Sequence, residues 1–462
     1  MAKRALGDDY SLDLCRRIAG WRYEDLPAGV VRTLKRLLLD TLGVIGGAAE
    51  APGIRALNRR LAAWESAGAA TGLIGKHRYS PPTAALANGA AAHALDFDDQ
   101  HDPARTHASC VVVPALLAVA EDVGGISGKQ FLLAFAVGAE LQARLGVACG
   151  RSLAHGWHPT MVFGVLAAGL AAGRLLGLDA DGLRNALGMA FHQASGSAQS
   201  MRDGVLSKRL GPGFAARGAV LSAFLAADGL SGTRRPLEGG AGLFSLYERD
   251  EVDSEALTEG LGATWRIPEY SFKPWPGCRC HHAAIGLGIR LHDEGVQAAA
   301  VREIEIGLGR MNWLTVGAPY EGATASVAHA QFNAAYSFAR ALSDGRLDLH
   351  SYQPPALVDP AIVALAARTR VVADPAIDPA SQAARIALTL RTGETIRAGA
   401  DTLKGSPRDP LSEDELLAKF RGCFDFGMGV PAAHTDRLAG IVLNLEQAPD
   451  AAQAIVAAFP GP

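Results

Sequence analysis

A short stretch rich in aspartate and histidine, set between two apolar segments, constrains the fold of this chain more than any other feature. Residues 85–109 read ALANGAAAHALDFDDQHDPARTHAS. The flanking runs, ALANGAAAHA before and CVVVPALLAVA after, predict buried helices. Polar groups held between buried helices have shifted pKa values and are typical of a functional site. A solvated acidic loop is the alternative. The ionisable side chains concerned are Asp96, Asp98, Asp99, His101, Asp102 and His107.

Long runs of small apolar residues with helical spacing surround this stretch. Gly164, Ala168 and Ala172 recur at every fourth residue, so one face of their helix carries only small side chains and a second helix can approach closely. The helix over 30–42 is expected to end at the glycines of 43–47. Helices are expected throughout 10–75 and over 112–120, 131–147, 161–176, 179–194 and 213–227.

The pattern changes after Pro268. Residues 301–308 and 384–390 alternate apolar and polar side chains, which predicts strands, and the TGE that follows the second run predicts a hairpin. Helical patterns at 332–342 and 361–367 lie between these strands, so 270–403 is expected to form a smaller α+β unit. Ser412 and Glu415 form a capping-box pattern that begins a further helix. Two more helices over 434–459 are expected to rejoin the first unit.

Charge and cysteine content narrow the class of protein. The 44 Lys+Arg and 47 Asp+Glu residues leave a net charge of -3, so no basic surface for nucleic acid is indicated. The six cysteines lack the spacing of a disulfide framework, which favours a reducing cytoplasm. The apolar run 161–173 is shorter than the roughly 20 residues of a membrane span. Asp8 and Asp9 argue against an export signal. We therefore expect a soluble cytoplasmic protein with neither a nucleic-acid nor a membrane partner.

Three further segments carry candidate functional residues. GWHPT places His158 before a proline at the start of a helix, where it could act as a base or simply cap the helix. SKRLGPGFAARG places Lys208 at the start of a helix, which is either a seat for a carboxylate or a solvated basic turn. FKPWPGCRCHH places Lys273 among aromatic and proline residues, where desolvation lowers a lysine pKa. The alternative is a lysine stem that packs on a ring.

A metal site is the remaining question for this part of the chain. Cys278, Cys280, His281 and His282 do not have the spacing of a structural zinc site, and no second Cys/His pair follows. The DFDD cluster of residues 96–99 could hold a divalent cation. We expect no metal and no cofactor.

Together these segments resemble the MmgE/PrpD family. The resemblance implies a mainly α fold, with a large all-helical domain built from both ends of the chain and an inserted smaller α+β lid domain. The domains would be 1–269, 270–403 and 404–462, and the assembly a homodimer. The matching segments are LLLDTLGVIGGA, ANGAAAHALDFDD, GWHPT, SKRLGPGFAARG, LEGGAGLF, FKPWPGCRCHH, AQFNAAYSFARAL and GSPRDPLSEDELLAKF.

The resemblance also implies a set of active-site residues. Gln100 stands where relatives often have a small hydroxyl residue, and the loop 99–107 is one residue longer than in the decarboxylase branch. Trp275, Gly277 and Cys280 replace a tyrosine, a cysteine and a second tyrosine of the family pattern. The implied catalytic residues are His158, Lys273, His107 and Asp96, and the implied substrate-binding residues are Lys208, Tyr336 and His282.

Family reactions share the transfer of a proton at a carbon next to a carboxylate, and the charge that develops there needs cations and donors around it. Lys208, Lys273 and protonated His107 are expected to supply them, with neutral His158 as base and Asp96 orienting a histidine. The expected function is a cofactor-independent lyase acting on a di- or tricarboxylic acid, first of all a dehydratase of the 2-methylcitrate type. The alternatives are an epimerase of an amino- or imino-dicarboxylate, a decarboxylase of the cis-aconitate type and a non-enzymatic helical scaffold.

Overall fold

The computed structural model describes residues 9–322 and 326–461. Residues 1–8, on which the expectation of no export signal rests in part, lie outside the described residues. The helices are α1 (Tyr10–Ala19), α2 (Ala28–Gly47), α3 (Ile54–Trp64), α4 (Pro81–His93), α5 (Ser109–Val123), α6 (Gly128–Ala148), α7 (Pro159–Leu175), α8 (Ala180–Phe191), α9 (Gln199–Arg202), α10 (Ser207–Ala227), α11 (Leu243–Leu246), α12 (Ser254–Thr258), α13 (His282–Asp293), α14 (Arg310–Val316), α15 (Val327–Gln331), α16 (Ala334–Asp344), α17 (Pro354–Leu357), α18 (Pro360–Ala366), α19 (Glu413–Met428), α20 (Ala432–Leu443) and α21 (Ala451–Ala458). The strands are β1 (Ala70–Gly72), β2 (His77–Tyr79), β3 (Gln100–His101), β4 (Tyr270–Ser271), β5 (Val301–Leu308), β6 (Thr369–Ala373), β7 (Ala384–Leu390) and β8 (Thr395–Ala400).

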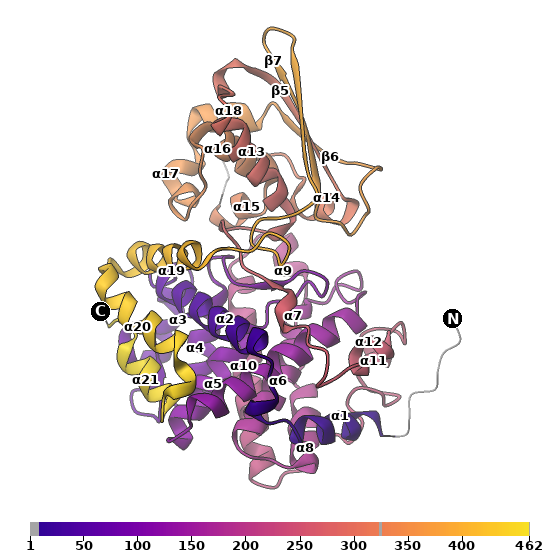
Figure 1. Ribbon diagram of the computed structural model, residues 1–462, viewed down its shortest axis with the longest axis vertical. Helices are drawn as coiled ribbons and strands as arrows, with labels where there is room; N and C mark the ends of the chain where they lie inside the picture. Colours follow the sequence, from indigo (N-terminus) through magenta and orange to yellow (C-terminus); the bar gives the residue numbers. More distant parts are fainter. Residues whose placement is uncertain (1–8, 323–325, 462) are drawn as a thin grey trace.

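Helices α1–α12 and α19–α21 form the larger, lower body in Figure 1. Its centre is made by α5, α6 and α7, in which almost every residue is buried. A Cβ atom added to Gly164 of α7 would lie 2.9 Å from Val111 of α5, and one added to Gly138 of α6 would lie 2.6 Å from Val112. The close approach of helices that the small residues predicted is therefore confirmed.

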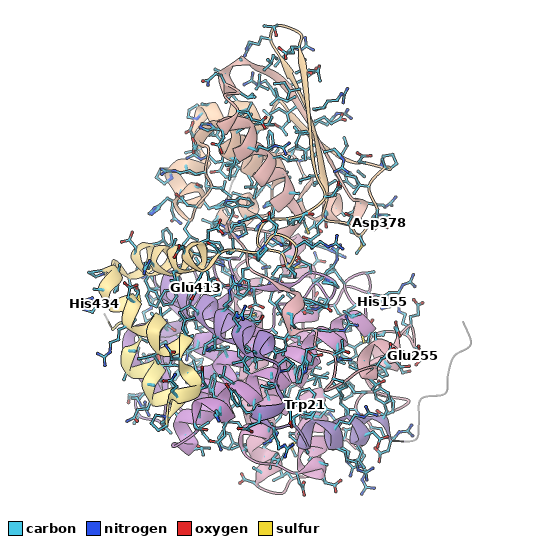
Figure 2. All side chains as sticks on the ribbon, viewed as in Figure 1. Trp21, His155, Glu255, Asp378, Glu413 and His434 are labelled. Atoms are coloured by element: carbon cyan, nitrogen blue, oxygen red, sulfur yellow. The ribbon has the colours of Figure 1, made fainter. Side chains whose placement is uncertain are left out.

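The C-terminal helices pack against the N-terminal part of the chain through α2 and α19. Helix α2 continues through Gly43 and Gly46 and ends at Gly47, the last of the glycines that were expected to end it. A Cβ on Gly43 would lie 2.9 Å from Phe420, and one on Gly46 would overlap the ring of Phe424. These glycines therefore form the flat side of α2 on which α19 packs. Figure 2 shows Glu413, the first residue of α19, and His434 of α20 on the outside of this C-terminal segment.

A mixed four-stranded sheet lies in the upper part of Figure 1, in the order β6-β5-β7-β8. β5 is parallel to β6 and antiparallel to β7, and β7 and β8 form the predicted hairpin. Helices α13 and α16 pack on the sheet and share a second hydrophobic cluster with it, which includes Ile304, Ile386 and Phe338. Strand β6 was not predicted, because its five residues follow α18 without a turn signal.

The expected fold class, mainly α with an all-helical large domain and a lid, is wrong. The chain is 57% helical and contains a mixed sheet of four strands. Strands also occur within the helical body, where β1 pairs with β2 and β3 with β4. Strands of two or three residues are too short to show the alternation that identifies a strand in a sequence. An interpretation of 10–75 as helix throughout therefore fails at β1.

The division of the chain into 1–269, 270–403 and 404–462 remains a proposal. Two separate hydrophobic clusters support it, because most buried apolar side chains between 283 and 403 form one cluster, whereas those of α19–α21, together with Leu349, belong to the other.

Among the described residues, α6 and α10 are long and apolar enough to cross a membrane by length and composition. However, 94% of the most apolar window of α6 and 61% of that of α10 are buried in the protein, as in core helices. The absence of a membrane partner stays a prediction.

Candidate active site

A two-residue strand pair joins the two polar stretches that the sequence analysis singled out. In β3 and β4, Gln100 pairs with Ser271 and His101 with Tyr270. Lys273, two residues after β4, reaches back so that its Nζ donates a hydrogen bond to the carbonyl oxygen of Asp96 at 2.8 Å. The pairing of β3 with β4 thus brings Lys273 to the DFDD loop.

The backbone around this contact is constrained. Asp96 has a φ of 49°, in the left-handed region that few residues other than glycine adopt. Its carbonyl oxygen also accepts a hydrogen bond from the backbone N–H of Gly277 at 3.0 Å. Gly277 has a φ of 109°, and a Cβ there would lie 3.0 Å from the carbonyl oxygen of Gln331. The glycine that departs from the family pattern therefore meets a backbone requirement.

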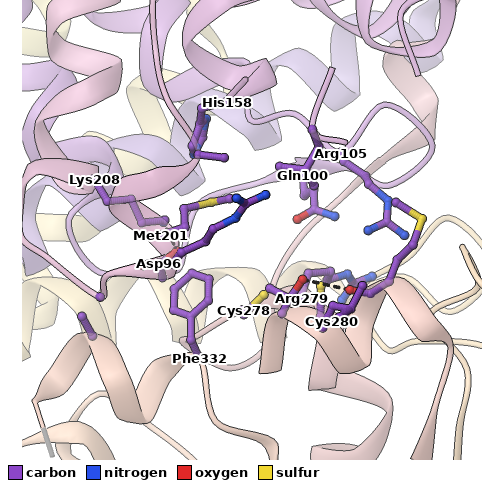
Figure 3. Close-up of a pocket in the computed structure, with 18 of the residues that line it drawn as sticks. Asp96, Gln100, Arg105, His158, Met201, Lys208, Cys278, Arg279, Cys280 and Phe332 are labelled. Atoms are coloured by element: carbon purple, nitrogen blue, oxygen red, sulfur yellow. Dashed lines mark hydrogen bonds and ion pairs between the residues drawn. The ribbon is translucent and has the colours of Figure 1, made fainter. Parts of the chain in front are cut away.

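These loops line a cavity of about 800 Å³ between the helical body and the sheet-bearing part. Figure 3 shows Lys208 and His158 on one side of it, with Cys278, Cys280 and Phe332 on the other. Five of the predicted site residues line this cavity: Asp96, His107, His158, Lys208 and Lys273.

A chain of buried polar contacts runs behind the cavity wall. The Nδ1 atom of His93 lies 2.8 Å from the Asp98 carboxylate, and its Nε2 atom lies 3.0 Å from Nζ of Lys208. Lys208 in turn donates a hydrogen bond to Oδ1 of Asp96 at 2.5 Å. Because an ammonium group only donates and a carboxylate only accepts, a neutral His93 ring carries its proton on Nδ1. Asp98 thus orients His93, and His93 helps to orient Lys208.

Asp96 and Asp98, the two aspartates in this series of contacts, are held in the ionised form. Burial alone would raise the pKa of Asp96, but the ammonium group of Lys208, with the neighbouring His93 and Lys273, lowers that pKa below its usual range. Burial opposes ionisation of Asp98 as well, yet His93 and His107 hold its pKa well below the ordinary value. The site therefore keeps two negative charges that balance part of its positive charge.

The cavity histidines are neutral. Burial lowers the pKa of His107 to about 3, despite the nearby charge of Asp98. Burial, followed by the charge of Lys208, lowers the pKa of His158 well below its ordinary value. Nδ1 of His107 donates a hydrogen bond to the carbonyl oxygen of Asp99 at 2.5 Å, which leaves Nε2 as the acceptor. The expectation of a protonated His107 is therefore wrong, because desolvation outweighs the attraction of one carboxylate.

His158 begins helix α7 as its N-cap residue. Its backbone N–H donates a hydrogen bond to the carbonyl oxygen of Gly196 at 2.8 Å, and the neighbouring Trp157 ring stacks on Tyr247. The buried Nδ1 of His158 has no hydrogen-bond partner among the described residues. The ring is thus positioned by backbone and packing contacts, and His158 lines the cavity.

Two predicted site residues do not line the cavity. Tyr336 is fully buried in α16, where its hydroxyl group donates a hydrogen bond to the carbonyl oxygen of Ser351. His282 lies behind the cavity wall, with Nδ1 3.5 Å from Nη1 of Arg279 and its ring edge-on to Trp275. Both residues stand at family positions, but the geometry gives them packing contacts and no direct path to a bound molecule.

Sequence reasoning missed several residues of the site. Arg279 is buried and binds the Asp102 carboxylate through two nitrogens at 3.3 Å. Arg105 and Arg202 also line the cavity. His93 ends an alanine-rich helix five residues before Asp98, and this spacing was the one signal that could have shown its role. The arginines carried no such signal, because their partners lie far away in the sequence.

One group of side chains among the described residues has the geometry of a three-ligand metal site: His93, Asp98 and Cys110. Burial raises the pKa of the Cys110 thiol well above its ordinary value, so it is a poor ligand in this state. The other two residues already bind each other. The expectation of no metal stays a prediction.

Two family models match this chain. The MmgE/PrpD N-terminal domain matches residues 12–255, and the MmgE/PrpD C-terminal domain matches residues 275–447. The chain belongs to the MmgE/PrpD family.

Several relatives of this chain carry an enzyme activity in their names. The cis-aconitate decarboxylase-like protein oryM of Aspergillus oryzae is 29% identical over 465 residues, which cover 96% of this chain and 95% of that protein. The cis-aconitate decarboxylase of Mus musculus is 29% identical over 424 residues, or 87% of this chain and 84% of the relative. The Aspergillus terreus enzyme of the same name is 31% identical over 285 residues, 59% of this chain and 58% of the relative.

Proposed function

We propose that this MmgE/PrpD protein is a lyase that acts on a small di- or tricarboxylic acid by proton transfer at a carbon next to a carboxylate. The family and the named relatives support a lyase acting on a carboxylic acid. The observation that carries the proposal is the cavity itself, in which two neutral histidines, His158 buried and His107 mostly buried, stand beside two buried lysines.

The charges around the cavity suit a polyanion. Lys208 forms an ion pair with the Asp96 carboxylate. Among the described residues, the ammonium group of Lys273 has a backbone carbonyl oxygen as its hydrogen-bond partner. Arg105 donates one hydrogen bond to the carbonyl oxygen of Ala380, and Arg202 lies exposed at the rim. Carboxylates that enter would therefore meet cations whose charge is not fully balanced, in a site where water is limited and charge interactions are strong.

The histidines supply the base. His158 accepts the proton from the carbon, since its ring is neutral and lines the cavity. Lys273 and Lys208 stabilise the negative charge that grows on the adjacent carboxylate. His107, through Nε2, is placed to take up or return a second proton. Positioned acid and base groups of this kind contribute roughly 10²- to 10⁴-fold in rate.

Decarboxylation is the first candidate reaction, because the relatives above are named for it. Loss of carbon dioxide leaves a carbanion, which takes up a proton from water. Dehydration, the reaction expected from the sequence, is the second candidate. Both reactions need the same cations around the developing charge. Epimerisation through Tyr336 loses support, because that hydroxyl lies outside the cavity lining.

A panel of small polycarboxylic acids, followed by NMR in heavy water with and without EDTA, tests the proposal. We expect one acid to lose carbon dioxide, or water, with deuterium exchanged at the reacting carbon. The His158→Gln variant should lose about 10²-fold or more in kcat. The His155→Gln variant is the matched control, since His155 lies outside the cavity lining and binds the carbonyl oxygen of Tyr247. Folded protein that neither converts nor exchanges any acid of the panel would contradict the proposal.

A further inference from the structure

Two cysteines stand in the cavity wall and take no part in the chemistry proposed above. Cys278 and Cys280 flank Arg279, and both line the cavity and are half-buried. The remaining cysteines of the chain are buried in the helical body: Cys15, Cys110, Cys149 and Cys423. The thiols in this wall are therefore the ones that a small molecule inside the cavity can reach.

The two thiols differ sharply in acidity because they bind each other. The hydrogen bond from Cys278 lowers the pKa of Cys280 to about 7, and the charges of Arg105 and Lys273 act in the same direction. The same hydrogen bond raises the pKa of Cys278 well above its ordinary value. Near neutral pH the pair therefore consists of a thiolate and a thiol side by side, which is the arrangement of a nucleophilic and a resolving cysteine.

The backbone permits a bond between them. Cys278 is extended, with φ -65° and ψ 131°, and a short 3₁₀ turn begins at Arg279. Residues two apart in such a turn fall within the Cα separation of about 4.4–6.8 Å that disulfides span. A metal is the other partner that such a pair could take. However, the three-ligand group found among the described residues lies elsewhere, at His93, Asp98 and Cys110.

We propose that Cys278 and Cys280 form a peroxide-reactive dithiol that closes to a disulfide within the cavity wall. The Cys280 thiolate attacks one oxygen of hydrogen peroxide, the O–O bond breaks, and a sulfenic acid forms as hydroxide leaves and takes up a proton to become water. The Cys278 sulfur then loses its proton and attacks the sulfenic sulfur. The S–S bond forms, the S–O bond breaks, and the departing hydroxide becomes a second water molecule. Two thiols are oxidised and one peroxide is reduced.

Closure of this bond would act on Arg279, the residue between the two sulfurs. Arg279 binds Asp102 on the opposite loop and the carbonyl oxygen of Lys404. The disulfide would restrain the backbone of a side chain that connects two loops of the cavity wall. The modification site therefore has a direct structural connection to the cavity, and it does not depend on which acid the protein converts.

Peroxide titration of the reduced full-length protein, with alkylation of free thiols and peptide mapping, tests this proposal. We expect the linked 278–280 peptide to appear first and to disappear on reduction with dithiothreitol. The thiols of Cys15 and Cys423 should stay reduced and serve as internal controls. In the Cys278→Ser variant, oxidation should stop at a sulfenic acid on Cys280 that dimedone traps.

Two results would overturn the proposal. One is that Cys278 and Cys280 both remain thiols under peroxide that fully oxidises a cysteine peptide in the same tube. The other is that Cys278 oxidises in the Cys280→Ser variant as fast as in the unaltered protein. Because the first measurement uses the unaltered protein and no substrate, it is independent of whether either variant folds and of the proposed lyase activity.

Discussion

Asp96 organises the site through two different groups. Its carboxylate binds Lys208 at 2.5 Å, and its backbone carbonyl oxygen binds Lys273 at 2.8 Å. The side chain therefore sets the position of one cation and the backbone that of the other. The left-handed φ of 49° at this residue is what turns both groups toward the lysines.

Removal of Lys208 should cost far more stability than removal of the whole pair. The Lys208→Met variant leaves the buried Asp96 carboxylate without its partner, which costs about 3–5 kcal/mol in similar cases. The double variant with Asp96→Asn should recover most of this loss and remain inactive. Urea unfolding measures the free energy of unfolding of the single and the double variant. Replacement of Arg421, whose pair with Asp436 is half-exposed, should change stability by less than about 1 kcal/mol. Equal stability of the single and double variants would contradict this account.

Asp99 should make the protein less stable as the pH rises. Burial, with the charges of Asp98 and Asp40, raises the pKa of Asp99 from 3.8 to about 8. Between these values the folded protein holds a proton that the unfolded chain has lost. The stability due to Asp99 is therefore full below about pH 4 and is lost as the pH rises through 8.

The Asp99→Asn variant lacks this titration. Its melting temperature, relative to that of the unaltered protein, should therefore rise steadily from pH 5 to pH 8 and level off above that. A difference that does not change with pH would show that Asp99 is ionised in the folded protein.

Residue types in short motifs allowed a large part of the site to be predicted. His158, Lys208 and Lys273 stood out because each precedes or follows a helix or strand end, and the structure places all three at one cavity. The state of His107 could not be predicted, since its pKa depends on how deeply the ring is buried. Arg279 escaped notice because its partner Asp102 is far away in the sequence.

At the scale of elements, helix α2 and helix α19 join the two ends of the chain. Their contact combines the glycines of 43–47 on α2, which we call the glycine strip, with a buried ion pair between Asp40 and Lys419 at 2.6 Å. Lys419 also donates a hydrogen bond to the carbonyl oxygen of Phe97, within the DFDD loop. Helix α19 therefore supports the loop that carries Asp96, although it contributes no residue to the cavity lining.

A single methyl group on the contact face of α2 should destabilise the protein. In Gly46→Ala, the new Cβ overlaps the Phe424 ring, and overpacking of this kind costs about 1–3 kcal/mol. Gly29→Ala is the matched control in the same helix, because nothing lies within 4 Å of a Cβ there. The control should be neutral or gain up to about 1 kcal/mol from helix propensity. Thermal unfolding compares them, and equal melting temperatures would show that the glycine strip is not a packing requirement.

Helix periodicity and the β7–β8 hairpin could be predicted because each repeats over enough residues to be recognised. The packing role of Gly43 and Gly46 was not predicted, since a glycine that ends a helix and one that admits an aromatic ring look alike in a sequence. The strand pair β3–β4 was missed for the opposite reason: it has two residues on each side and joins segments that are remote in the chain.

At the scale of the whole molecule, a homodimer remains our prediction, but the surface that supports it has changed. The apolar helices α5, α6 and α7, which suggested an interface, are buried within one chain. Helix α10 instead exposes Phe214 and Leu221, each at 42%. Exposed apolar residues on one helix face are typical of a contact with a second copy. The cytoplasmic location also stays a prediction.

Light scattering at micromolar concentration should therefore give twice the chain mass of 48.1 kDa. A Phe214→Glu, Leu221→Glu double variant should shift the mass toward a single chain. The Leu246→Glu variant should not, although Leu246 is more exposed, because it lies on α11. A single species of 48.1 kDa for the unaltered protein would contradict the prediction.

The central claim is that buried, neutral histidines perform the proton transfer, and the pH dependence of kcat/KM tests it most directly. The measurement uses the acid identified in the panel and corrects for the separately titrated ionisation of that acid. Because burial lowers the pKa of His107 to about 3 and that of His158 well below its ordinary value, both remain bases in weakly acidic solution. The account predicts no loss of kcat/KM centred near pH 6.5. A loss with its midpoint at about 6.5, the ordinary value for a solvated histidine, would contradict it.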